Sequence, residues 1–305
     1  MSLARQLQAM PHHFTIDVEE YFHPTPLAPW MPRNAWHGLE RRSPGVVERI
    51  LDALSAHEAR ATFFVLGWLA EREPEMVRAI ARAGHEVASH GWDHRVVREF
   101  TPDQFRDDVR RTKSCLEDIV GAPVIGYRAP SFSIVPGLEW ALNVLVEEGH
   151  TYDSSLFPTR LHPTYGYPCH RDPHGMLLES GRLVEIPPST LRLSGTNLPA
   201  SGGAYFRLFP YALIRAALTS AEKREAPGTF YIHPWELDPD SPRLSLPWYL
   251  HLRVRGSSGN PWTRVERLLK GFQFRRMDET AGEIFRTETS SWTQRTMPGN
   301  GRRDP

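Results

Sequence analysis

Two histidines four residues apart, His90 and His94, are the side chains of this sequence best suited to hold a metal ion. On a helix, an i,i+4 pair would place both imidazoles on one face, close enough to bind one ion. Two histidines do not complete a metal site, so a third ligand must come from elsewhere, and the run Asp17-Val18-Glu19-Glu20 is the obvious donor. Spacing alone favours two surface histidines at a strand end, because His-x-x-x-His pairs are common by chance.

Asp17 and Glu19 could divide metal binding and proton transfer between them. They lie two residues apart, where a short strand is expected to end. One carboxylate could ligate the metal while the other acts as general base on a water molecule bound to it. The structural alternative is that both are solvated loop acids.

Three more residues could serve the same chemistry. Arg128 keeps its proton, so beside a carboxylate it would lower the pKa of that group and orient it. His233 follows an apolar run and could protonate a leaving amine, because an imidazole titrates near neutral pH. Asp153 would suit the acid that steadies such a histidine. A surface ion pair for Arg128 and a core histidine for His233 are the structural alternatives.

The elements that must position these residues alternate between strand-like and helix-like segments, which is typical of βαβ units and a parallel sheet. We expect strands near residues 14–18, 61–67, 85–89, 124–128, 184–186 and 229–232, with a possible one at 272–277. We expect helices near residues 44–57, 74–84, 101–119, 138–148, 209–221 and 263–270. The start Thr101-Pro102-Asp103-Gln104 has the pattern of a capping box.

The candidate residues lie at the carboxyl ends of four of these strands. In barrel-like α/β folds those ends share one face, where active sites form. The topology would therefore bring Asp17, Glu19, His90, Arg128 and His233 together. This convergence favours a metal site over two chance histidines.

Composition narrows the class of protein. The 305 residues can form one α/β domain of barrel size or two smaller domains. Lys+Arg and Asp+Glu both total 36, which argues against nucleic acid as a partner. The nine tryptophans could line a sugar-binding cleft or pack in the core. The two cysteines are too few for a disulfide framework. We see no secretory signal and no transmembrane run, so we expect a cytoplasmic protein.

At these residues the chain resembles the polysaccharide deacetylase family, the NodB-homology carbohydrate esterases. Five motifs occur in the family's order. They are Thr15-Ile16-Asp17-Val18-Glu19, His90-Gly91-Trp92-Asp93-His94, Arg128-Ala129-Pro130, Asp153-Ser154-Ser155, and His233 after Phe230-Tyr231-Ile232. Each is loose alone, but five in order over residues 13–240 are specific.

The resemblance implies a distorted (β/α) barrel of about seven parallel strands, and hydrolysis of N-acetyl groups on the amino sugars of a glycan. It also implies a divalent metal ion, usually Zn²⁺, with Co²⁺, Ni²⁺ or Mn²⁺ as alternatives. Carried over by position, Asp17 is the general base, oriented by Arg128, and His233 is the general acid, tuned by Asp153. The metal ligands are Glu19, His90 and His94. The backbone N–H near Ser131 helps to stabilise the oxyanion, and Trp235 lies beside the substrate.

The first motif departs from the commonest pattern of the family. There the two acids are adjacent aspartates, whereas here Val18 separates Asp17 from Glu19. Glu20 therefore remains a rival for the third metal ligand.

The chain further resembles the subgroup found with exosortase and exopolysaccharide loci. This resemblance rests on the runs Asp17-Val18-Glu19-Glu20-Tyr21-Phe22, Gly202-Gly203-Ala204-Tyr205-Phe206-Arg207 and His233-Pro234-Trp235-Glu236, together with residues 242–247. By analogy, the substrate is a glycan precursor or lipid-linked oligosaccharide inside the cell. The alternatives are a deformylase or ureide amidohydrolase of the same fold, and a catalytically inactive glycan-binding module.

We expect one catalytic domain over residues 13–240 and a C-terminal extension over 241–288 packed on the barrel. A disordered tail is expected over residues 289–305, which are rich in Ser, Thr, Arg and Gly.

Overall fold

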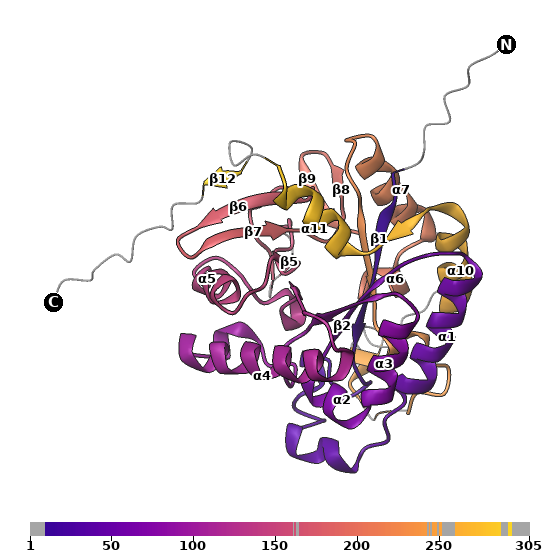
Figure 1. Cartoon of the computed structure of the whole chain (residues 1–305). Coiled ribbons are helices and arrows are strands. Elements are labelled where there is room, and N and C mark those ends of the chain that lie inside the picture. The colour runs from indigo at the N-terminus through magenta and orange to yellow at the C-terminus, as the bar shows by residue number, and fades with distance from the viewer. Residues whose placement is uncertain are drawn as a thin grey trace.

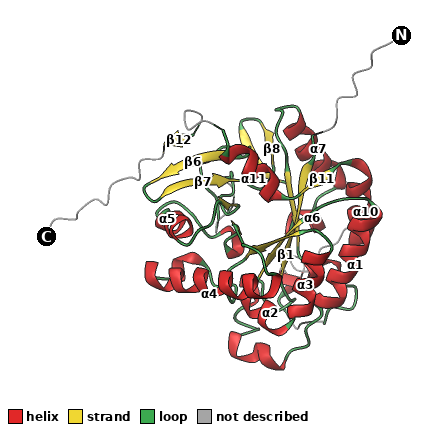
Figure 2. Ribbon diagram, in the orientation of Figure 1, coloured by secondary structure: helices red, strands yellow, loops and turns green. Residues whose placement is uncertain are grey.

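A curled, mostly parallel sheet is the centre of the molecule, and helices cover its outer surface (Figures 1 and 2). The computed structural model describes residues 10–160, 162, 165–242, 244, 246–248, 250–251, 260–287 and 292–294. Within them, a continuous row of seven neighbouring strands pairs in parallel, as the distorted barrel predicts. Across the sheet they are β10 (Thr229–Ile232), β1 (His12–Val18), β2 (Thr62–Val65), β3 (Glu86–Ser89), β4 (Gly126–Tyr127), β5 (Tyr152–Asp153) and β7 (Gly181–Glu185).

The barrel is irregular where β7 and β10 would meet, because these two strands do not pair. Residues between them bond to β10 instead: Ser189 N donates to Thr229 O at 3.0 Å and Tyr231 N donates to Ser201 O at 2.8 Å. The sheet continues past β7 through antiparallel β6 (His174–Leu178), which pairs with β12 (Thr293–Gln294). Short β11 (Phe274–Arg275) pairs with the start of β1, and β8 (Thr190–Leu193) and β9 (Thr196–Pro199) form a separate hairpin.

Six α-helices of the described residues follow the expected order, with ends shifted by a few residues, and four more, at 67–72, 204–208, 234–237 and 277–285, were not expected. They are α1 (Ser43–Ala56), α2 (Gly67–Arg72), α3 (Pro74–Arg82), α4 (Pro102–Val120), α5 (Trp140–Glu147), α6 (Ala204–Leu208), α7 (Tyr211–Glu222), α8 (Pro234–Leu237), α10 (Pro261–Gly271) and α11 (Met277–Phe285). The capping box before α4 is confirmed, because Thr101 Oγ1 accepts from Gln104 N and Gln104 Oε1 accepts from Thr101 N. Residues 272–277, expected as a strand, contain β11 and the start of α11.

Strand β1 is buried on both faces, and its two faces differ in character. Phe14, Ile16 and Val18 are fully buried in the apolar core that the sheet shares with its outer helices. Successive strand residues face opposite ways, so Thr15 and Asp17 face the barrel interior, where both contact Arg128. The interior is thus polar at the level where chemistry is expected.

The C-terminal part of the chain packs on this frame. Val265 and Leu268 of α10 are buried in the main core. Trp292, within the expected disordered tail, is 7% exposed and precedes β12. Residues 289–291 and 295–305 of that tail lie outside the described residues, as do Arg243 and Ser245 of the 242–247 run.

Candidate metal centre and active site

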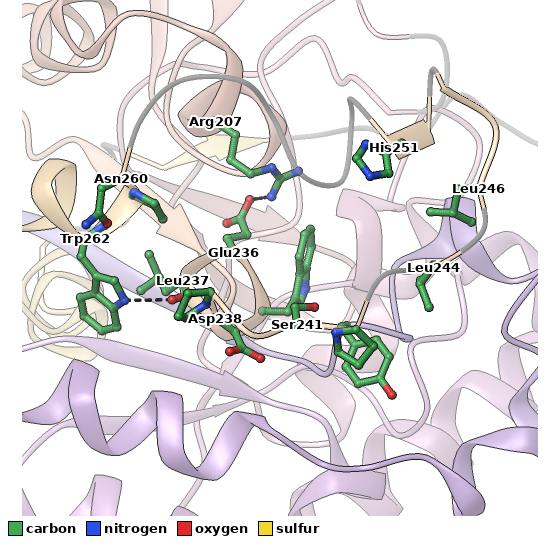
Figure 3. Close-up of a pocket in the computed structure, with 15 residues that line it drawn as sticks. Arg207, Glu236, Leu237, Asp238, Ser241, Leu244, Leu246, His251, Asn260 and Trp262 are labelled. Carbon is green, nitrogen blue, oxygen red and sulfur yellow. Dashed lines mark hydrogen bonds and ion pairs between the residues drawn. The ribbon is translucent and has the colours of Figure 1, made fainter.

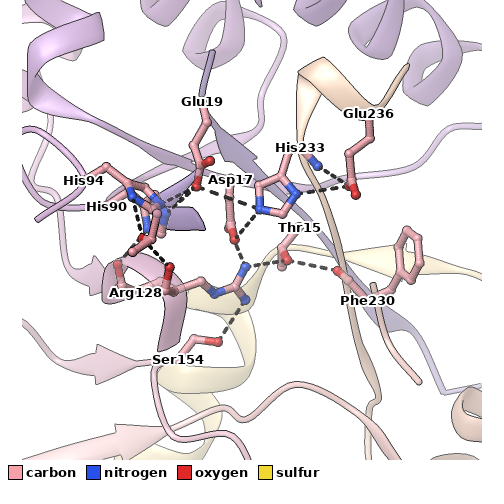
Figure 4. Close-up of polar contacts among 12 residues, drawn as sticks. Thr15, Asp17, Glu19, His90, His94, Arg128, Ser154, Phe230, His233 and Glu236 are labelled. Carbon is pink, nitrogen blue, oxygen red and sulfur yellow. Dashed lines mark hydrogen bonds and ion pairs between the residues drawn. The ribbon is translucent and has the colours of Figure 1, made fainter. Parts of the chain in front are cut away.

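Glu19, His90 and His94 form a compact cluster of buried potential ligands (Figure 4). One ligand atom from each lies within 4.8 Å of the other two. The Nε2 atoms of His90 and His94 are 3.2 and 2.9 Å from the same oxygen, Glu19 Oε1. Glu19 follows β1 and His90 follows β3, so the parallel sheet brings these distant segments to one edge.

The two histidines are not on a helix, so the i,i+4 interpretation of their spacing is wrong. Residues 91–94 form an irregular bend, in which Gly91 and His94 take positive φ angles of 74° and 59°. The turn folds His94 back toward His90, and their ring centroids lie 5.7 Å apart. A loop therefore achieves the convergence that we expected from a helical face.

The bonds on the far side of His90 fit a metal site. Its Nδ1 lies 2.8 Å from the carbonyl oxygen of Arg128, and because a carbonyl only accepts, Nδ1 carries the proton and donates. Its Nε2 faces Glu19 Oε1, so a bound cation could take the place of a proton between these two atoms. Metal-ligating histidines usually have such an outer hydrogen-bond partner. Burial alone would lower the pKa of His90, but the charges of Asp17 and Glu19 raise it.

Glu20, the rival third ligand, is engaged elsewhere. Its Oε1 accepts from Ser43 N at 2.9 Å and from Ser43 Oγ at 2.6 Å, and its Oε2 accepts from Arg42 N at 3.0 Å. These donors lie at the start of α1, so Glu20 accepts hydrogen bonds from backbone N–H groups that have no partner within the helix. The donor cluster therefore contains Glu19 and leaves Glu20 out.

Asp17 is held by the most deeply buried arginine of the described chain. Arg128 is 0% exposed and its Nη1 donates to Asp17 Oδ1 at 2.6 Å. Thr15 Oγ1 and Ser154 Oγ accept from Nη1 and Nη2 at 2.8 and 2.9 Å. The guanidinium also lies 4.0 Å from the centre of the Phe64 ring. Arg128 is thus fixed from several sides and in turn donates to one oxygen of Asp17.

His233 faces the metal cluster with one ring nitrogen. Its Nε2 is 3.8 Å from both Asp17 Oδ2 and Glu19 Oε1. Burial lowers the pKa of His233, against the opposing effect of Glu19 and Asp17. A neutral imidazole at this place can exchange a proton with a group that binds between these acids.

The acid that holds His233 is Glu236 and not Asp153. His233 Nδ1 is 3.1 Å from Glu236 Oε2, which also accepts from the His233 backbone N–H at 2.9 Å. Asp153 lies on β5, five strands from β10 across the sheet, and accepts from Ser155 Oγ at 2.5 Å. Burial raises the pKa of Asp153 to about 6. Sequence reasoning missed Glu236, although the i,i+3 spacing from His233 at a helix start is that of a capping box.

A cleft of about 650 Å³ opens over these groups. Asp17, Glu19, His94 and His233 lie along it, as do Ser131 and Trp235, the two residues expected beside the substrate. Ser131 takes a positive φ of 55° and its Oγ lies 2.8 Å from Thr25 Oγ1. Four more aromatic rings complete the walls: Phe132, Tyr165, Tyr205 and Tyr231. Such walls suit the apolar faces of sugar rings.

A smaller cavity of about 220 Å³ is lined by residues of α8 and of the C-terminal extension (Figure 3). Arg207 and Trp235 line both cavities. Trp262, from the C-terminal extension, lines the smaller one and donates from Nε1 to Leu237 O at 2.9 Å. The extension therefore contributes to the surroundings of the site.

Two profiles of known protein families match the sequence. The sequence profile described as polysaccharide deacetylase matches residues 37–144, and a profile for a domain of unknown function (DUF3473) matches residues 154–282. Residues 37–144 thus match the polysaccharide deacetylase family. The first match includes His90, His94 and Arg128, and the second includes His233.

Two bacterial relatives in this family match part of the chain. A peptidoglycan-N-acetylglucosamine deacetylase of Bacillus cereus is 34% identical over 94 residues, 30% of this chain and 34% of the relative. A peptidoglycan deacetylase of Helicobacter pylori is 30% identical over 121 residues, 39% of this chain and 40% of the relative. The match thus spans two fifths or less of each relative.

Two solved structures share the fold over nearly the whole chain. A proposed polysaccharide deacetylase from Mycobacterium smegmatis aligns with a TM-score of 0.62 at 23% identity, covering 94% of this chain and 93% of the other. The allantoinase Puue aligns with a TM-score of 0.59 at 19% identity, covering 91% of each. In the part of the chain that the structure describes, no helix is both long and apolar enough to cross a membrane.

Proposed function

We propose that this chain is a metal-dependent hydrolase that removes N-acetyl groups from amino sugars of a glycan. The observation that carries the proposal is the position of Asp17 and His233 beside the ligand cluster. His233 Nε2 lies 3.8 Å from Asp17 Oδ2 and the same distance from Glu19 Oε1. A base, an acid and a set of metal ligands thus surround one point in an aromatic cleft.

Glu19, His90 and His94 would hold the metal ion, with Zn²⁺ as the expected ion and Co²⁺, Ni²⁺ or Mn²⁺ as alternatives. Two imidazole nitrogens and a carboxylate oxygen are donors that such ions accept. When bound, the ion supplies Lewis-acid polarisation of the acetyl carbonyl and makes water more acidic.

Asp17 acts as the general base. Arg128 occupies Oδ1, which leaves Oδ2, on the side of His233, to take a proton from the attacking water. Because Arg128 cannot release its proton, it remains a positively charged partner that orients Asp17 for this task.

His233 acts as the general acid for the leaving amine. Its Nδ1–H stays bonded to Glu236, so His233 acts as an acid in its imidazolium form, and the second proton, on Nε2 facing the cluster, passes to the amine. The backbone N–H beside Ser131 would donate to the oxyanion of the tetrahedral intermediate. Trp235 lies against the His233 ring, with centroids 5.1 Å apart, and forms part of the substrate wall.

We further propose that the glycan is an exopolysaccharide precursor, or a lipid-linked oligosaccharide, handled in the cytoplasm. Support comes from the resemblance of residues 202–207 and 233–236 to the subgroup found with exopolysaccharide loci. Fractionation of the native host with an antibody to this chain would test the compartment, and recovery in the medium would contradict it.

A panel of substrates tests the chemistry. We expect purified protein loaded with Zn²⁺ to release acetate from N-acetylglucosamine oligomers, and to be inactive on allantoin and on N-formyl sugars. Turnover of allantoin or of the formyl sugar alone would replace the proposal with one of these related amide hydrolyses. Binding of glycan without any turnover would indicate an inactive glycan-binding module.

A further inference from the structure

Arg207 contacts the acid that holds His233, although it lies on a different segment. Arg207 Nη1 donates to Glu236 Oε1 in an ion pair (Figure 3). Both side chains are buried, at 7% and 0% exposure. Glu236 therefore accepts from Arg207 through one oxygen and from His233 through the other.

Stacked rings connect the same residues a second time. The Arg207 guanidinium lies 4.6 Å from the centre of the Trp235 ring. Trp235 stacks on His233 with centroids 5.1 Å apart and an interplanar angle of 23°. Arg207, Glu236, His233 and Trp235 thus form a closed ring of contacts, which we name the His233 support ring.

The glycines of the run at residues 202–207 explain how Arg207 reaches this ring. A Cβ on Gly202 would lie 1.9 Å from the carbonyl oxygen of Tyr231, the strand residue two before His233. Gly203 has a φ of 56°, and a Cβ there would lie 2.9 Å from the Tyr231 ring. Only glycines permit this approach, which docks α6 against β10 and directs Arg207 to Glu236.

We propose that Arg207 is a positioning residue for the proposed deacetylation, acting through Glu236 to hold the His233 ring with Nδ1–H bound and Nε2 toward the substrate. The proposal rests on the proposed function. A carboxylate paired on both oxygens has one favoured orientation, whereas Glu236 without Arg207 can rotate away from His233. Support of this kind typically changes activity about 10- to 100-fold.

The test compares Arg207→Met with Arg264→Met. Methionine keeps the apolar stem against Trp235 and removes the charge. Arg264 is a suitable control because it donates to Phe206 O, on the same helix α6, and does not pair with Glu236. We expect Arg207→Met to lower kcat about 10- to 100-fold with little change in KM, and Arg264→Met to leave both near wild type.

A second readout needs neither substrate nor turnover. In ¹⁵N-labelled protein we expect wild type and Arg264→Met to show His233 as one tautomer with a slowly exchanging Nδ1–H. In Arg207→Met that signal broadens or is lost. An unchanged Nδ1–H signal, or a kcat equal to that of Arg264→Met, overturns the proposal. A wild type that releases no acetate refutes the proposed function instead, and the ¹⁵N spectrum still decides the role of Arg207.

Two further variants test the proposal if Arg207→Met does not fold. Arg207→Lys keeps a charge near Glu236 without the planar fork, so its kcat should lie between those of wild type and Glu236→Gln. The double variant Arg207→Lys/Glu236→Gln should lose no more kcat than Glu236→Gln alone, because both changes act through one contact. Additive losses would show that Arg207 acts independently of Glu236.

Discussion

Asp17 and Glu19 have different partners because they reach different depths of one barrel face. Residues two apart on a strand share a face, so both point inward, while Val18 between them packs in the apolar core. Asp17 reaches Arg128, and Glu19, beyond the strand end, reaches the two histidines. Val18 separates the two acids, which departs from the commonest family pattern. This separation lets Asp17 reach Arg128 while Glu19 reaches the two histidines.

This difference predicts separate effects of two substitutions. We expect Asp17→Asn to keep the metal and to lower kcat about 10²- to 10⁴-fold, because the amide still accepts from Arg128 but cannot act as a base. His90→Ala should lose both metal and activity. Metal analysis of the purified variants, alongside kcat, makes the comparison. If Asp17→Asn loses its metal, Asp17 is a ligand and the roles given to the two acids are wrong.

At the scale of elements, Glu20 belongs to helix α1 more than to the active site. Two backbone N–H groups and a hydroxyl at the start of α1 donate to its carboxylate. Burial nevertheless raises the pKa of Glu20 above its usual value.

Glu20→Gln should therefore change stability and not metal binding. We expect a loss of about 1 kcal/mol in the free energy of unfolding, the typical effect of a weakened helix cap. Metal content should equal that of wild type, whereas Glu19→Gln should bind metal poorly. Urea unfolding and metal analysis on both variants test this, and metal loss in Glu20→Gln would restore Glu20 as a ligand.

The docking of α6 against β10 depends on the absence of a side chain at Gly202. Gly202→Ala should unfold at clearly lower urea concentration than Gly195→Ala. Gly195 also has a positive φ, of 83°, but a Cβ there meets nothing within 4 Å. The control therefore measures backbone strain alone, about 1–2 kcal/mol, and the additional loss in Gly202→Ala measures the contact with Tyr231. Equal losses would show that α6 can shift without penalty.

At the scale of the whole molecule, buried histidines make the fold sensitive to acid. Burial lowers the pKa of His12 and of His85 to about 4 each, and that of His150 to about 3. The unfolded chain binds protons to these rings below about pH 6.5, and the folded chain does not. The stability that these neutral rings contribute is therefore fully present above about pH 6.5. It is lost as the pH falls from there toward their lowered pKa values.

The contribution of one buried ring can be measured at His150, which is 2% exposed and packs edge-on against Tyr127. Between pH 7 and pH 5 we expect wild type to lose about 2 kcal/mol more than His150→Phe, from this single ring. Urea unfolding at the two pH values measures the difference, with exposed His170→Gln as a control that keeps the wild-type slope. Equal slopes for His150→Phe and wild type would mean that His150 is protonated in the fold.

Six of the seven neighbouring parallel strands and six helices could be read from the sequence because periodicity is local, whereas the short strand β5 could not. Apolar runs such as residues 61–67, the capping box at Thr101 and the acids at strand ends each depend on a few neighbouring residues. Parallel pairing then requires strand ends to share one edge, so the convergence of Asp17, Glu19, His90, Arg128 and His233 followed without coordinates.

Only the tertiary structure decided which polar neighbours meet, because that depends on side-chain direction and on how loops dock. Glu19 and Glu20 are alike in sequence, but one points into the barrel and the other to α1. Asp153 had a plausible motif but lies five strands from His233, while Glu236 is one helical turn away. Arg207 reaches Glu236 only because two glycines let its segment approach β10. Local patterns determine the elements, and such long-range contacts assemble the site.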